Sequence, residues 1–295
     1  MSRQAFYTFI LTVALFALSP GRAQHRTPAT SREAQKMIDR VVSHQKENDH
    51  ALDLYERIER VEVRRTGSDT RPSAVRIARV IPAGTGTARI PLGPDGKSPN
   101  AEAYRTELDK VVKALTWAAE EGRPQREAYE KIAKKRKERD ELIDATRTAF
   151  FYTFVGQETR DGVQLSKYSL EPNPAFHPTS RIATIFTRVR GFVWVDENSG
   201  QLARVEGDVT EDISVVLFFG KIYKGSHFMQ ERYEIAPGVW LPTFSQYDFD
   251  GRKFFSSFAV HERTFYSNYH RIGPPKEALE TLRAELNNRE LRADP

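Results

Sequence analysis

The sequence predicts an α+β fold in which a curved antiparallel β-sheet, an unclosed half-barrel, is capped by helices. Two observations carry this prediction. From Ala149 onward, strand-like segments and turn signals alternate every ten to fifteen residues, which is typical of an antiparallel meander. Before that point, apolar residues recur at helical spacing in two separate regions. Because a long sheet must curl to bury one face, helices are expected to cover it.

The N-terminal part should form one helix followed by strands. Ser31 is a suitable N-cap, and apolar residues at helical spacing predict a helix over about 32–48. Residues 52–64 alternate in polarity, which predicts a strand with one half-solvated face. A second strand is expected around 74–81. The glycine- and proline-rich segment 84–99 is expected to be a loop or an irregular strand.

Residues 100–148 change character and predict an inserted, charged helical pair. Asn100 is a suitable cap, and the segment around Gly122 interrupts the helical pattern. The centre of the second helix is densely charged. It fits either a solvated helix held by i,i+4 pairs such as Lys137 with Glu141, or a contact for anionic headgroups or a partner. The residues expected to make that contact are Lys134, Lys135, Arg136, Lys137 and Arg139.

The strands of the second half are expected to meet at glycine-containing turns. Asp161-Gly162 is the strongest hairpin signal, and further turns are expected at 198–200, Pro237-Gly238 and Asp250-Gly251. Residues 181–196 are expected to form one strand of a hairpin. The meander should end at Pro274-Pro275, before a polar C-terminal helix.

The N-terminus is typical of a secretory signal peptide. A basic residue precedes a continuous apolar stretch, and small residues end at Ala23. An N-terminal membrane anchor is the alternative. The predicted organisation is a signal peptide over 1–23, a single half-barrel domain over 24–273 that includes the helical insertion, and a polar tail over 274–295. The chain has no cysteine, so lipidation at a cleavage-site cysteine is excluded and a periplasmic or secreted protein is expected.

No pattern in the sequence predicts catalysis. The seven histidines are not spaced as metal ligands, and neither a nucleophile elbow nor a phosphate-binding loop is present. We therefore expect no enzyme activity, no catalytic residue, no metal and no cofactor. A hydrolase that uses carboxylates at the turns is a remote alternative. The net charge of +5 arises from 45 basic and 40 acidic residues, which suits anionic lipid surfaces better than nucleic acid.

The aromatic residues concentrate between residues 149 and 270. Strand alternation predicts that several of them share a face of the sheet with aliphatic residues. Two interpretations stay open, because periodicity identifies a face and not what covers it. The residues either fill a packed core or line a cavity for an apolar ligand. The residues expected to line such a cavity are Ile182, Phe186, Phe192, Trp194, Trp240 and Phe244.

Segment 191–207, "GFVWVDENSGQLARVEG", resembles the recurrent hairpin of the outer-membrane lipoprotein carrier and sorting superfamily, including its uncharacterised exported branch. A strand with tryptophan and aspartate turns and returns as a short strand with leucine and arginine. The "KGS" segment at 224–226 and segment 236–251 also match. The resemblance implies an open half-barrel whose cavity holds acyl chains.

The resemblance also implies a function without catalysis. The expected function is binding of a lipid or lipoprotein acyl chain, as a carrier, with an envelope membrane protein and peripheral membrane contact as further partners. The alternative on the same fold is a protein-interaction or envelope-stress sensor module. That alternative predicts a fully packed sheet without an internal cavity.

Overall fold

The computed structural model of the chain describes residues 30–98, 100–215, 220–253 and 256–288. The predicted signal peptide, residues 1–23, lies outside these ranges. The described part is α+β, and its twelve strands form one antiparallel sheet that does not close into a barrel, which confirms the predicted fold class. The strands are β1 (Tyr55–Val63), β2 (Ala74–Pro82), β3 (Thr87–Leu92), β4 (Phe150–Arg160), β5 (Val163–Pro172), β6 (Val189–Asp196), β7 (Gln201–Val209), β8 (Ile213–Val215), β9 (Gly220–Ile222), β10 (His227–Ala236), β11 (Val239–Lys253) and β12 (Ser256–Arg271). The helices are α2 (Arg32–Ala51), α3 (Ala101–Ala119), α4 (Arg123–Ala149) and α5 (Pro275–Asn287), with short 3₁₀ turns at Leu52–Leu54 and Ala183–Arg188.

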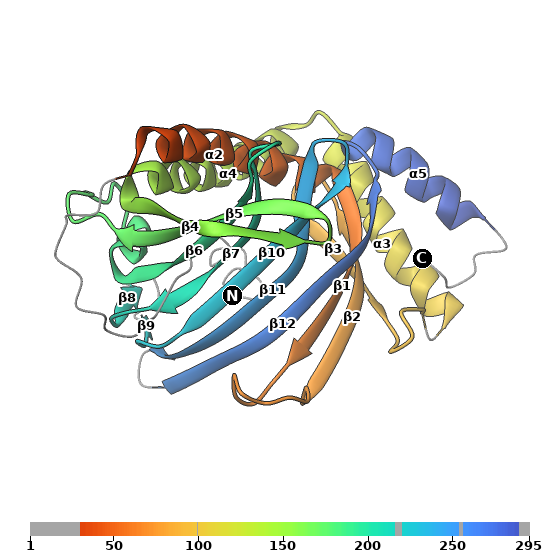
Figure 1. Cartoon of the computed structure of the whole chain (residues 1–295). Coiled ribbons are helices and arrows are strands. Elements are labelled where there is room, and N and C mark those ends of the chain that lie inside the picture. Colours follow the sequence, from red (N-terminus) through yellow and green to blue (C-terminus); the bar gives the residue numbers. More distant parts are fainter. Residues whose placement is uncertain (1–29, 99, 216–219, 254–255, 289–295) are drawn as a thin grey trace, which may run out of the picture.

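The strand order places the N-terminal strands beside the C-terminal strand of the sheet. The main path is β3-β2-β1-β12-β11-β10-β7-β6-β5-β4, so the N-terminal strands extend the sheet from its last strand, β12. The edges of the path are β3 and β4, and β8 and β9 form a small extension against β11. The sheet curves around α2 and α4 (Figure 1). We call the face that these two helices cover the inner face and the opposite face the outer face.

Helix α2 supplies the centre of the core on the inner face. Its N-terminus is capped by the Ser31 side chain, which accepts a hydrogen bond from the Ala34 backbone N–H at 3.1 Å. Near its other end, the Asn48 side chain donates to Gln201 at 2.8 Å and accepts from the Trp240 backbone N–H at 2.9 Å. These bonds fix the helix across the strands. Its buried apolar residues are Ala34, Met37, Ile38, Val41 and Val42.

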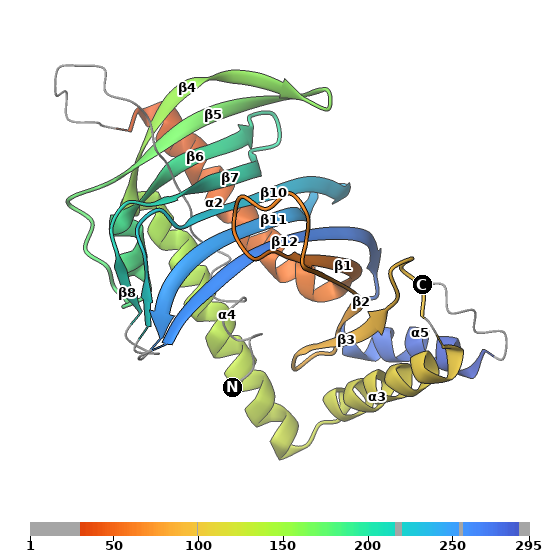
Figure 2. The ribbon, with the colours of Figure 1, turned by 90° about the horizontal axis from the view of Figure 1, so that it is seen from below.

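A second core lies on the outer face at the β1–β3 end, where α3 and α5 pack against the sheet (Figure 2). Leu108 and Leu115 of α3 and Leu282 of α5 are fully buried there with Ile81 of β2. The predicted helical pair therefore divides between the two faces, because α3 packs with α5 and α4 packs with α2. Each helix carries its apolar residues on one stripe, and this stripe is buried against the sheet or another helix.

Local turn chemistry explains the best-predicted hairpin. Asp161 and Gly162 both have positive φ, 51° and 81°, as a two-residue type I′ turn requires between β4 and β5. The turn expected at Asp250-Gly251 is wrong, because β11 continues to Lys253. A side chain at Gly251 would collide with the Lys221 carbonyl oxygen of β9 and with the Phe258 ring. Glycine here permits close approach of a strand instead of a turn.

Tertiary contacts decide one open expectation and override another prediction. Segment 84–99 was expected to be a loop or an irregular strand, and part of it is strand β3, which pairs with β2 from Ile77 to Pro82. Conversely, residues 183–188 form a 3₁₀ turn instead of the start of a strand. The Ser180 hydroxyl accepts a hydrogen bond from the Ala183 backbone N–H at 3.1 Å, which opens this turn and directs Phe186 into the core.

Candidate functional site

A cavity of about 1370 Å³ lies between the inner face of the sheet and helices α2 and α4. Its size exceeds the ordinary range of roughly 300–1,000 Å³ for small-molecule sites. At the β1–β3 end it reaches the surface, where the lining residue Val75 is 43% exposed. The cavity therefore combines an opening with an interior large enough for an extended ligand.

The interior end of the cavity is apolar. Residues of α2, α4 and β4–β7 line it, and most of them also belong to the main core. These elements place aliphatic and aromatic side chains on the inner face, and the charged lining residues that α2 and α4 add are Asp49, Lys135, Glu138 and Arg139. The apolar lining at this end comprises Ile38, Val41, Leu142, Ile143, Phe150, Tyr152, Leu170, Val193, Leu202 and Val205.

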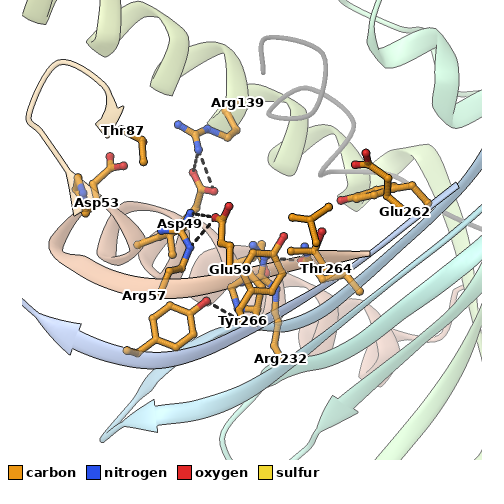
Figure 3. Close-up of a pocket in the computed structure, with 18 of the residues that line it drawn as sticks. Asp49, Asp53, Arg57, Glu59, Thr87, Arg139, Arg232, Glu262, Thr264 and Tyr266 are labelled. Atoms are coloured by element: carbon orange, nitrogen blue, oxygen red, sulfur yellow. Dashed lines mark hydrogen bonds and ion pairs between the residues drawn. The ribbon is translucent and has the colours of Figure 1, made fainter. Parts of the chain in front are cut away.

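The other end of the cavity is charged, and arginines from β1 and β3 share one carboxylate. Arg57 Nη2 lies 2.6 Å from Glu59 Oε1, and Arg89 Nη2 lies 3.0 Å from Glu59 Oε2. Strand alternation puts Arg57 and Glu59 on the same side of β1, beside the ring of Tyr266 on β12 (Figure 3). Two cations on one acid leave this part of the wall positively charged.

Arg232 of β10 is a buried cation on the same wall. It is 4% exposed, and its guanidinium donates to the Trp240 carbonyl oxygen and to Gln230 Oε1 at 3.3 and 2.8 Å. Among the described residues it takes part in no ion pair, and its Nε has no hydrogen-bond partner. Burial lowers the pKa of Arg232, while the charge of Asp49 raises it. An arginine stays protonated under these conditions, so its positive charge is only partly compensated.

Asp49 of α2 lies opposite Arg232 and is held by α4. Arg139 Nη1 lies 3.0 Å from Asp49 Oδ2, and Figure 3 shows Arg139 reaching from its helix toward this carboxylate. Burial raises the pKa of Asp49, whereas Arg139 and Arg232 lower it. Gln45, one turn earlier on α2, also lines the cavity, and its Oε1 has no hydrogen-bond partner within the described ranges. Polar groups thus surround the charged end from both layers.

Three tyrosines complete the charged end. Burial raises the pKa values of Tyr247, Tyr266 and Tyr269, so their phenols stay neutral at physiological pH. The Tyr269 hydroxyl donates to the Pro242 carbonyl oxygen at 2.6 Å. Burial is the main cause of the raised pKa of Tyr269, while the charges of Arg57 and Arg232 lower it and the charge of Glu59 raises it.

The six residues predicted to line a cavity do not lie together. Ile182 lines the cavity, whereas Phe186 is fully buried in the core against the rings of Phe150 and Phe176. The other four are absent from the cavity lining. The expectation that Ile182 and Phe186 share a strand face with Phe192 and Trp194 is wrong, because residues 183–188 are a 3₁₀ turn.

The aromatic residues of the hairpin pack on the outer face instead. Val193 and Val195 of β6 belong to the core beneath α2, so Phe192 and Trp194 point the other way. The amine of Lys167 lies 3.7 Å from the Phe192 ring centre and 4.4 Å from that of Trp194. Trp240 joins the cluster of Trp194, and Phe244 packs against Phe265 of β12.

The five basic residues of α4 that were predicted to contact headgroups or a partner divide into two sets. The two arginines are half-buried and paired, Arg136 with Asp53 at 2.5 Å and Arg139 with Asp49. They join α4 to the end of α2 beside the cavity. The lysines are exposed. They are Lys134, Lys135, which also lines the cavity, and Lys137, which lies 3.9 Å from Glu141 as the i,i+4 pattern predicts.

Sequence reasoning missed the charged residues of the cavity. Arg57 and Glu59 belong to the alternating segment 52–64, for which the sequence predicts a half-solvated face. Arg232 stands at an inner-face position of β10, two residues from Gln230 and four from the buried Phe228. The available signal was this placement of charged residues on the same strand faces as apolar ones.

No group of three or more metal-ligating side chains occurs within the described ranges. Of the helices that the structure describes, none has the length and apolar character needed to cross a membrane. Comparisons with family models, with curated proteins and with solved structures give no match to this chain.

Proposed function

We propose that this protein binds the acyl chain of a lipid or of a lipid-modified protein in the inner-face cavity and catalyses no reaction. The single observation that supports this function best is the apolar end of a cavity of about 1370 Å³. Each methylene group moved from water into such an environment favours binding by about 0.8 kcal/mol. A chain of many methylenes is therefore the ligand that gains most from this lining.

The cavity also favours this function over the interaction or sensor module. That alternative requires a sheet whose faces are fully packed, whereas the inner face borders a large space. The resemblance of segment 191–207 to the lipoprotein carriers leads to the same proposal from the sequence. Export to the periplasm, and contact of the exposed α4 lysines with a membrane or an envelope protein, belong to the proposal as well.

The test is to fill the apolar end with a bulky side chain. Val205 lies on β7 at this end and is half-buried, so the larger ring of Val205→Trp would extend into the cavity. The control Val155→Trp makes the same change on β4, where Val155 is 53% exposed and outside the cavity lining. Binding is measured by fluorescence of the uncharged apolar probe N-phenyl-1-naphthylamine and its displacement by dodecanol.

The expected result is specific to the position of the new ring. Wild type and Val155→Trp should bind the probe and release it to dodecanol, whereas Val205→Trp should lose at least about tenfold in affinity while keeping its circular dichroism spectrum. Equal binding by both tryptophan variants would place the probe elsewhere on the molecule. Failure of wild type to bind either compound would refute the acyl-chain proposal.

A further inference from the structure

Arg232 has hydrogen-bonding capacity that the described protein does not use. A guanidinium carries five N–H donors, and only two are engaged, by the Trp240 carbonyl and by Gln230. Arg232 is only 4% exposed, and it lines the cavity. Burying a cation without a hydrogen-bonded acid is costly, so proteins seldom retain one without a partner.

A comparison with Arg79 shows how this chain buries an arginine for structural reasons. Arg79, on the outer face, is 6% exposed and pairs with two carboxylates, those of Glu56 and Glu285, both at 2.7 Å. Arg232 is equally buried but has no carboxylate in ion-pair contact among the described residues. The difference lies in location, because Arg232 borders the cavity and Arg79 does not.

The surroundings of Arg232 add positive charge. Its own neighbours Asp49 and Arg139 neutralise each other, and Glu59 is shared between Arg57 and Arg89. This cluster of four arginines and two acids keeps a net positive charge beside the neutral phenols of Tyr247, Tyr266 and Tyr269. A second polar atom without a partner among the described residues, Gln45 Oε1, lines the same cavity from the opposite layer, on α2.

We propose that Arg232 binds the anionic headgroup of an amphipathic ligand whose chain occupies the apolar end of the cavity. This inference rests on the proposed acyl-chain function and defines its ligand class as an acyl compound with a carboxylate or phosphate head. Such an oxyanion accepts the unused donors of the guanidinium and supplies the missing negative charge. The apolar and charged ends of one cavity then bind the two parts of one molecule.

The experiment compares three ligands that share a twelve-carbon chain: dodecanol, dodecanoate and dodecyl phosphate. Their affinities are measured by probe displacement at neutral pH, below their micellar concentrations. Wild type should bind at least one of the two anions more tightly than dodecanol by about tenfold or more, and the tighter anion identifies the headgroup. Equal affinities for all three would overturn the inference and leave the acyl-chain function standing. No binding of any of the three would refute both.

Variants assign the preference to Arg232. Arg232→Met should abolish the preference for the anion and leave dodecanol affinity within about twofold of wild type, whereas Arg232→Lys should keep part of the preference. Arg204→Met, on the outer face, is the control and should behave as wild type. A preference that survives in Arg232→Met would overturn the assignment to this residue.

A second variant, Asp49→Asn, tests the same inference if Arg232→Met fails to fold. Asp49→Asn removes the resident negative charge that acts on Arg232, and the amide oxygen can still accept from Arg139. This variant should bind the anion several-fold more tightly and dodecanol unchanged. Weaker binding of the anion by Asp49→Asn would contradict electrostatic recognition at this site.

Discussion

Replacing Arg79 by methionine should show what holds the outer helices to the sheet. Arg79 of β2 donates to Glu56 of β1 through both Nε and Nη2, at 2.9 and 2.7 Å, and to Glu285 of α5 at 2.7 Å. The side chains of Arg79 and Glu56 are 7% and 11% exposed. Methionine fills a similar volume but leaves the Glu56 carboxylate buried without its cation.

The expected loss follows from that burial. Breaking a buried ion pair by removing one partner costs about 3–5 kcal/mol, mostly because the remaining charge is left uncompensated. Glu285, at 25% exposure, is solvated and adds little. In urea unfolding followed by circular dichroism, this corresponds to a midpoint lower by roughly 1–2 M.

Two further variants test whether the loss of stability comes from the buried ion pair. Arg79→Met combined with Glu56→Gln should recover much of the loss, because no buried charge is then left alone. Lys113→Ala breaks a surface pair with Asp109, whose side chains are 75% and 41% exposed, and should change stability by less than about 1 kcal/mol. If Arg79→Met also costs less than about 1 kcal/mol, or if the double variant is no better than the single one, the pair does not hold the layers as described.

Two predictions concern pH. Burial raises the pKa of the Tyr104 phenol from 10.0 to about 12, so the stability it contributes is complete below pH 10 and is lost as the pH rises toward 12. Tyr104→Phe should lack this part of the alkaline loss in urea unfolding curves, and an unchanged alkaline slope would contradict the raised pKa. Burial raises the pKa of Asp49 from 3.8, so its ionisation destabilises the fold as the pH rises above that value. Asp49→Asn should therefore be more stable than wild type at neutral pH, by a margin that shrinks on acidification; a margin that grows in acid would count against this sign.

Local chemistry explains which elements the sequence could predict. The turn at Asp161-Gly162 follows from the positive φ that only such residues adopt readily, and the start of α2 follows from the Ser31 cap. Both depend on interactions within a few residues. The turn at Asp250-Gly251 failed for the opposite reason, since the same dipeptide accommodates β9, a strand that begins thirty residues earlier in the chain.

The candidate site could not be predicted because β6 is apolar on both faces. Val193 and Val195 face α2, whereas Phe192 and Trp194 face outward, where Lys167 and other charged side chains cover them. Alternation assigns residues to two faces but does not say which face helices will cover. The larger aromatic side chains pointed to Phe192 and Trp194 as cavity residues, but these two side chains pack on the outer face.

The polarity of the cavity is a consequence of strand order. Strands β4–β7 are consecutive and place apolar residues beneath α2, whereas the charged wall comes from β1, β3, β10 and β12. The arginines of β1 and β3 reach this wall because β1 pairs with β12. Pairing of β1 with β4, its neighbour among the strands after the helical pair, would bring these arginines against the apolar end. The long connection through α3 and α4 therefore does more than cover the sheet. It allows the first and last strands to meet, and that meeting separates a charged end from an apolar end within one cavity.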